Sequence, residues 1–570
     1  MKRQRIDLPK RQRALIFQGG VALGAYEAGV FRELYDWINP YVKEEENVFD
    51  VIAGASIGAI NGAILVSHVI DNREKGPKKS WEGAAEKLEY FWRQNSTISA
   101  VELLSPWFTL WWQGWHESVE NYKQGAEHFL KMHQQYNEHL LSLLSFFPLQ
   151  SSSPLSSPSS SIQYSNGWYK WLRQMINFVD TPATGESARR YYSSLQFLYP
   201  FTFPYSGAPN VFSSIFKPDG RFIFNPRNYL SRIDNENIPF FSLKNSLNRA
   251  YYKDGTRFVD FPIATSFDEN LPRFLTVTVD VENGKTVAFD SYPKSDGSRN
   301  TEYGNNEEDQ QTEQESNYRI DYNDGIGWEH LRTSAATTHT LQYPTLEDTY
   351  SKEERTFWDG SLLSNTPMRE LIHQHKAFWT DYLKKVMNKK IWDGEQGEKI
   401  PALDIYIVNL WPTKLKDRKP IPSDNDFISD RFLDLIFHDK TPFEEKVTKM
   451  VTDYIKIISQ LIPLAEKADS KKVKELLDNP NNNPNLYAAS RNSKEAEDRH
   501  YRRLLEGQFE IDRIVRIERS DDEDSVSIDM TDYSRGTTEN LIRQGREDAR
   551  RTIRRIEVDR EFNPSLLMGQ

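Results

Sequence analysis

The chain has 570 residues and contains no cysteine. This absence excludes disulfide bonds, thiolate catalysis and zinc sites with cysteine ligands, and it fits a reducing cytosol. No run of about 18 apolar residues occurs, so the sequence predicts no membrane-spanning helix. The basic amino terminus, MKRQRIDLPKRQR, is not followed by an apolar signal core. We expect residues 1–13 to form a disordered tail, with contact to anionic lipid as the less favoured alternative.

The chain also has fewer positive than negative charges. The 72 lysines and arginines are outnumbered by 83 aspartates and glutamates, which gives a formal net charge of −11. A general nucleic-acid binder needs a basic face to neutralise phosphates, so the composition argues against that class. The hydrophobic content of 38% is enough for a sizeable core. The sequence therefore predicts a globular protein.

A strand, a turn of small residues and a helix occur twice near the amino terminus. RALIFQGG reads as a buried strand ending in glycines, and VALGAYEAGVFRELYDWI has apolar residues at helical spacing. VFDVIAGAS followed by IGAINGAILVSHVI repeats this plan. Two such units in about 60 residues predict a parallel α/β architecture.

The rest of the chain changes character several times. We expect a first α/β part (14–80), an aromatic-rich helical insertion (81–250), a second α/β part (251–420) and a mostly helical carboxy-terminal extension (421–570). The second part contains RFLTVTVDVENGKTVAFDSY, where ENGK predicts a hairpin turn, and the strand ALDIYIVN. Its acidic, polar stretch 295–325 predicts a disordered loop. The extension includes one strand-like segment, IDRIVRIER.

The expected insertion contains two unusual stretches. SSSPLSSPSSS, residues 151–161, is of low complexity and cannot build a core. Trp107, Trp111, Trp112 and Trp115 form an aromatic cluster of the kind found at lipid–water interfaces. Packing of these rings against the α/β core is the slightly favoured alternative.

Ser56 lies in the motif GASIG, between Gly54 and Gly58. A nucleophilic serine on a sharp strand-to-helix turn needs neighbours without bulky side chains, and these two glycines meet that need. The following helix would also direct its amino-terminal amides and positive dipole end at the serine. The alternative is a close-packing helix face, because Gly62 continues the four-residue spacing.

The glycine loop Gln18–Gly24 occupies the same kind of position, between a strand and a helix. It lacks the Lys-Ser/Thr of a phosphate-binding loop and the spacing of a dinucleotide fold. Backbone amides of Gly19, Gly20 and Val21, joined by that of Ile57, could instead stabilise an oxyanion, each contributing on the order of 3 kcal/mol. A tight turn without a catalytic role is the alternative.

A nucleophilic serine also needs a base. None of the eleven histidines is an obvious candidate. Asp359 stands out among the Asp-Gly pairs for its setting, RTFWDGSLLSNTPMRELI, although most such pairs are turns.

These three pieces together resemble the patatin-like phospholipases. QGGVALGAYEAGV, GASIG and DGS occur in the order of that family's oxyanion loop, nucleophile motif and aspartate motif. The resemblance implies a three-layer α/β/α fold and acyl-ester hydrolysis by a Ser-Asp dyad, without a metal or cofactor. It makes Ser56 the nucleophile, Asp359 the base, and Gly19 and Gly20 oxyanion donors. Gly24 and Gly360 complete the matching motifs. The resemblance also implies that the substrate is an acyl lipid, reached through peripheral membrane contact or in solution.

The match has departures. Val21 stands where the family has a third glycine, Leu23 stands at a basic position, and Ser361 replaces a usual glycine or alanine. These departures motivate an alternative, a non-catalytic lipid-binding or scaffold protein with this fold. A dinucleotide-binding oxidoreductase is a further alternative, but it would want a glycine at Ile60. IVNLWP and DYSRGTTENLIRQGREDARRTI resemble the carboxy-terminal extension of a bacterial branch.

Overall fold

A computed structural model describes the parts of the chain on which the following rests. These are residues 8–96, 247, 255, 257–301, 319–336, 343–393, 397–411, 431, 433–479, 501–505, 507–520 and 535–562. The tryptophan cluster, the Ser/Pro-rich stretch and most of the expected insertion lie outside them.

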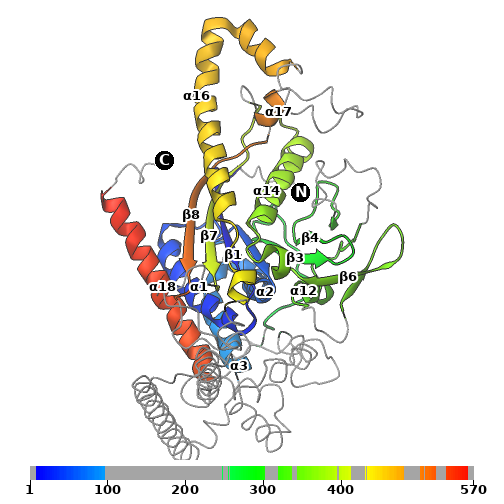
Figure 1. The fold of residues 1–570 in the computed structure, drawn as a ribbon, viewed down its shortest axis with the longest axis vertical. Coiled ribbons are helices and arrows are strands. Elements are labelled where there is room, and N and C mark those ends of the chain that lie inside the picture. The colour runs from blue at the N-terminus through cyan, green and yellow to red at the C-terminus, as the bar shows by residue number, and fades with distance from the viewer. Residues whose placement is uncertain are drawn as a thin grey trace, which may run out of the picture.

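A mixed sheet of eight strands forms the centre of the molecule (Figure 1). The strands are β1 (Arg11–Phe17), β2 (Val51–Ala55), β3 (Arg273–Asp280), β4 (Lys285–Asp290), β5 (Thr345–Glu347), β6 (Glu354–Asp359), β7 (Ala402–Asn409) and β8 (Ile511–Glu518). Their order is β5-β6-β3-β2-β1-β7-β8, and β4 pairs with β3. Strands β3, β2, β1, β7 and β8 are mutually parallel, whereas β4 and β6 run antiparallel to β3. The β3–β4 hairpin, the strand β7 and the strand β8 confirm three sequence predictions.

Helices cover both faces of the sheet. They are α1 (Gly24–Ile38), α2 (Ile57–Asp71), α3 (Ala84–Asn95), α12 (Trp328–Ser334), α13 (Ser361–Ser364), α14 (Met368–Asp381), α16 (Pro442–Asp478), α17 (Tyr501–Leu505) and α18 (Arg535–Phe562). Apolar residues of α1, α2, α3 and α18 form one core cluster with one face of the sheet, and residues of α14 form another with the opposite face. The fold is therefore a three-layer α/β/α sandwich, as predicted.

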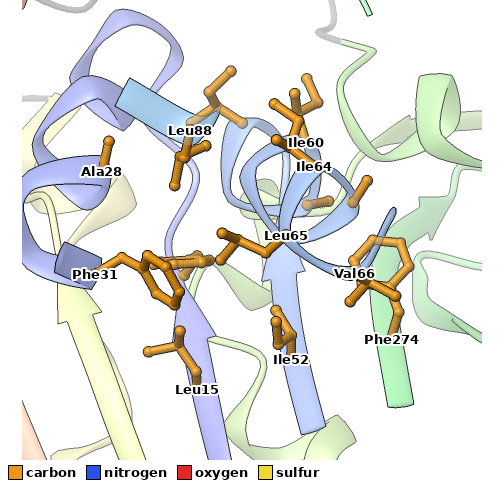
Figure 2. Packing of buried hydrophobic residues seen from close by; sticks show 14 of the residues in the cluster. Leu15, Ala28, Phe31, Ile52, Ile60, Ile64, Leu65, Val66, Leu88 and Phe274 are labelled. Carbon is orange, nitrogen blue, oxygen red and sulfur yellow. The ribbon is translucent and has the colours of Figure 1, made fainter. Parts of the chain in front are cut away.

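The central strands are apolar on both sides because both faces are covered. In β1, Leu15 and Phe17 belong to the cluster under α1 and α2, and Ala14 and Ile16 to the cluster under α14. Figure 2 shows the first cluster, where Phe31 of α1 lies close above Leu15. The sheet is thereby held rigidly between two layers, and its carboxyl ends are fixed in space.

Three regions differ from the sequence predictions. Strand β1 begins at Arg11, inside the predicted tail, because this residue already pairs with Ala402 of β7. Helix α3, predicted as part of the insertion, belongs to the main core, where Leu88 is fully buried. The predicted disordered loop 295–325 is ordered at both ends, where Asn300 and Asp321 form a β-bridge. In the first two cases a distant segment supplies pairing or burial that local composition does not reveal, and in the third the two ends of the stretch pair with each other.

The described helices contain none that is long and apolar enough to cross a membrane. The longest, α16, instead exposes several large apolar side chains along its length, among them Phe443, Tyr454, Ile457, Leu461 and Leu464.

Helix α18 lies directly against α1 (Figure 1), and two glycines permit this approach. A Cβ atom on Gly29 would overlap the backbone oxygen of Ile542, and one on Gly545 would overlap that of Tyr26. The exposed ion pair between Arg550 and Glu33 flanks this crossing. The carboxy-terminal helix is therefore an integral part of one layer.

We expect Gly545→Ala to lower the free energy of unfolding by about 1 kcal/mol, a fall of about 2 °C in the thermal midpoint. In a helix without this contact the same change would raise the free energy of unfolding by about 1 kcal/mol. The sign of the change therefore tests whether α18 packs closely against α1. Circular dichroism with thermal unfolding measures the effect. Arg543→Ala is the control on the same helix, since its side chain is 64% exposed. A rise in the midpoint for Gly545→Ala would contradict the close crossing.

Candidate active site

The sheet register brings Ser56 and Asp359 together. Strand β2 pairs with β3 as far as Ala55 opposite Val277, and the next residue of β3, Thr278, pairs with Asp359 of β6. Strand β4 occupies the opposite edge of β3. Strand β6 therefore pairs with the same edge as β2, starting at the residue where the pairing with β2 has ended. Ser56, the first residue after β2, therefore meets the last residue of β6.

Ser56 sits on a strained turn between β2 and α2. Its φ of 53° lies in the left-handed region, which is rare for a residue with a side chain. Gly54 and Gly58 allow this turn: a Cβ on Gly58 would lie 2.5 Å from the oxygen of Phe17, and one on Gly54 would overlap the backbone of Gly58. The backbone therefore turns sharply at Ser56, where the two neighbouring glycines leave no room for side chains.

The two side chains form a buried pair. Ser56 Oγ donates a hydrogen bond of 2.6 Å to Asp359 Oδ2, and the two residues are only 5% and 4% exposed. Asp359 Oδ1 accepts from the amide and the hydroxyl of Ser361, at 2.8 and 2.7 Å. Burial raises the pKa of Asp359 to about 6, although the hydrogen bonds from Ser56 and Ser361 act in the opposite direction. This carboxylate is thus more basic than an ordinary aspartate.

Three of the described histidines have a ring nitrogen engaged elsewhere. His68 Nε2 lies 2.8 Å from the oxygen of Glu82, and His375 Nε2 lies 2.8 Å from that of Pro401. His330 Nδ1 accepts from the amide of Gly327. Within the described residues, the carboxylate of Asp359 is the group that accepts a hydrogen bond from Ser56 Oγ.

Helix α12 and the residues after it hold both members of the pair. Ser334 Oγ accepts from the amide of Ser56 at 3.0 Å, and its backbone oxygen accepts from the amide of Gly360 at 3.2 Å. The amide of Asp359 donates to the oxygen of Ala336 at 2.5 Å. Gly360 cannot carry a side chain here because a Cβ would overlap the oxygen of Val277. Nothing in the local sequence singles out Ser334, since its role arises from contacts with segments far along the chain.

The glycine loop lies against Ser56. A Cβ on Gly19 would lie 2.8 Å from the Cβ of Ser56, and one on Gly24 would lie 2.7 Å from Cγ1 of Ile57. The amide of Gly19, however, donates to Oδ1 of Asn365 at 2.7 Å. Asn365 was not identified from the sequence, although it lies in SNTP directly after the aspartate motif.

Three amides predicted as oxyanion donors keep their hydrogens available. In the described part of the chain, no acceptor is recorded for the amide of Gly20, Val21 or Ile57. Ile57 is the first residue of α2, where an amide lacks an intrahelical partner and the helix dipole is positive. Within the described residues these three amides are unpaired, whereas that of Gly19 donates to Asn365.

Val21 adopts a backbone conformation that suits glycine. Its φ is 51°, which is strained for a β-branched residue. The loop therefore keeps the geometry that a glycine at this position would allow, and the amide of Val21 is retained. Within the described residues, no group of three or more histidines, aspartates or glutamates is placed to hold a metal ion.

Comparison with known proteins gives one family. Residues 15–192 match the family model described as "Patatin-like phospholipase". No curated protein matches the chain. Among solved structures, VipD from Legionella pneumophila is similar at 11% identity, covering 95% of this chain and 67% of that one. Its TM-score is 0.25, so this likeness carries no argument.

We expect Val21→Gly to raise the free energy of unfolding by about 1 kcal/mol. Relief of strain at a positive φ is worth about 1–3 kcal/mol and exceeds the entropy that glycine adds to the unfolded chain. Val21→Ala is the control because its Cβ keeps most of the strain. Thermal unfolding of the three proteins checks the order, and equal midpoints for the glycine and alanine variants would contradict it.

Proposed function

We propose that the chain is a lipid acyl hydrolase in which Ser56 and Asp359 form the catalytic dyad, since residues 15–192 match the patatin-like phospholipase family model. The substrates are carboxylic esters of phospholipids or related acyl lipids. The hydrogen bond of 2.6 Å between Ser56 Oγ and Asp359 Oδ2, on a strained strand-to-helix turn, is the observation that carries the proposal. Intact dyad geometry also favours catalysis over a purely lipid-binding role.

In the proposed reaction, Asp359 accepts the proton of Ser56 as Oγ attacks the ester carbonyl. The amides of Gly20, Val21 and Ile57 stabilise the resulting oxyanion. The protonated Asp359 then gives its proton to the departing alcohol or lysolipid, leaving an acyl-serine. Water, deprotonated by Asp359, attacks this ester, and the proton returns to Ser56 as the fatty acid leaves.

The environment of Asp359 suits this role. A carboxyl group with an ordinary pKa near 3.9 is a weak base, whereas one near 6 is better matched to a reaction at neutral pH. Burial therefore makes the carboxylate more basic, while the hydrogen bonds of Ser361 keep it oriented.

The proposal includes peripheral contact with lipid, because such substrates lie in membranes or micelles. Vesicles of anionic and of zwitterionic phospholipid, compared in a flotation assay, would reveal such contact.

We expect a fluorophosphonate probe to label the wild-type protein at one site and to leave Ser56→Ala unlabelled. Asp359→Asn should lower ester turnover by at least about 100-fold, because the amide cannot accept the serine proton. Asp324→Asn is the matched control, an exposed Asp-Gly aspartate far from Ser56 in the sequence. Labelling that survives Ser56→Ala would refute the assignment. A folded protein that binds lipid vesicles but hydrolyses no ester would favour the lipid-binding alternative.

The pH dependence provides an independent test. Since the carboxylate must be ionised to accept a proton, kcat/KM for an uncharged ester should fall as the pH drops through about 6. Above that pH the rate should reach a plateau. An acid limb near pH 4 would show that Asp359 titrates as an ordinary aspartate and would contradict the effect of burial.

A further inference from the structure

The peptide groups around Gly19 are fixed at both ends. The amide of Gly19 donates to Asn365 Oδ1 at 2.7 Å, and its carbonyl oxygen accepts from Trp411 Nε1 at 2.7 Å. The neighbouring side chain of Gln18 adds two bonds, donating to Thr366 Oγ1 at 2.8 Å and accepting from the amide of Leu410 at 2.7 Å. The glycine loop is thus tied to the segment after α13 and to the end of β7.

The bond from Trp411 determines the direction of an oxyanion donor. In a planar trans peptide, the carbonyl oxygen of one residue and the amide hydrogen of the next point in opposite directions. Holding the oxygen of Gly19 on the Trp411 indole therefore directs the N–H of Gly20 away from the indole. This orientation matters because an oxyanion hole works only if its donors are already aligned.

The segment that leads into α16 supports both side chains. Asn365 Nδ2 donates to the backbone oxygen of Phe437 at 2.5 Å, and the ring of Phe437 lies 5.3 Å from that of Trp411. Two residues further on, Asp439 Oδ2 accepts from Asn409 Nδ2 at 3.0 Å. Asp439 also forms an ion pair with Arg516 of β8. The carboxy-terminal extension thereby contacts the residues that hold the glycine loop.

We propose that Asn365 and Trp411 are positioning residues for the oxyanion hole, supported by Phe437 of the carboxy-terminal extension. This inference rests on the proposed function, which supplies the reaction that the loop serves. Asn365 and Trp411 are only 7% and 5% exposed, so water cannot readily replace a lost partner. The extension is accordingly part of the active-site support and not an independent appendage.

Trp411→Phe tests the orientation of the Gly20 amide. The variant keeps an aromatic ring against Phe437 and removes the indole N–H, together with part of the side-chain volume, a loss that the control below shares. We expect kcat for ester hydrolysis to fall about 10- to 100-fold with KM changed less than about twofold, because the donor acts on the transition state. Trp379→Phe is the control, since it removes another buried indole N–H. Trp379 lies on α14, and its Nε1 donates to Gln12 Oε1 at 3.0 Å. A kcat for Trp411→Phe that equals that of Trp379→Phe would overturn the inference.

Asn365→Leu tests the same support without any need for activity. Hydrogen exchange measured by mass spectrometry on a peptide covering residues 14–23 should become at least about tenfold faster at the Gly19 amide, because this amide loses its acceptor. Unchanged exchange would overturn the inference. If the wild-type protein hydrolyses no ester but this exchange accelerates, the proposed function fails while the support of the loop stands. If Ser56-dependent hydrolysis is present and both variants behave as wild type, only the support fails.

Discussion

The site depends on two strands that pair with successive parts of one edge of β3: β2 pairs with the first part and β6 with the last. Val277 pairs with Ala55 at the end of β2, and Thr278 pairs with Asp359 at the end of β6. A shift of either strand by one residue would turn its side chains to the opposite face. The buried layers on both sides oppose such a shift, because Ala53 and Leu275 already belong to the cluster under α14. The distance between Ser56 and Asp359 is therefore a property of the whole sandwich.

Burial changes the acid–base properties of the paired carboxylate. The carboxylate of Asp359 is oriented by neutral partners, Ser56 and Ser361, and desolvation raises its pKa. A salt bridge would have had the opposite effect, since a nearby cation favours the ionised form. The glycine loop is held in the same manner, by amide and indole groups that carry no charge. The groups that hold Asp359 and the glycine loop in place are thus uncharged.

Much of this arrangement could be predicted from the sequence, and the remainder could not for physical reasons. Alternating strands, glycine turns and helices predicted the α/β layers, and GASIG predicted the elbow because its steric requirements are local. The engagement of the Gly19 amide was not predicted. Its partner Asn365 lies 346 residues away, and Trp411 lies 392 residues from the carbonyl that it holds. Such contacts follow from strand order and register, which local composition does not encode.

We propose that Ser56 and the amides of Gly20, Val21 and Ile57 converge on one reacting centre. A crystal structure of the protein after reaction with a phosphonate ester tests it most directly. We expect phosphorus bonded to Ser56 Oγ, with its non-bridging oxygen within about 3 Å of those three amide nitrogens. An adduct whose oxygen points away from the glycine loop, or bonded to another residue, would contradict it.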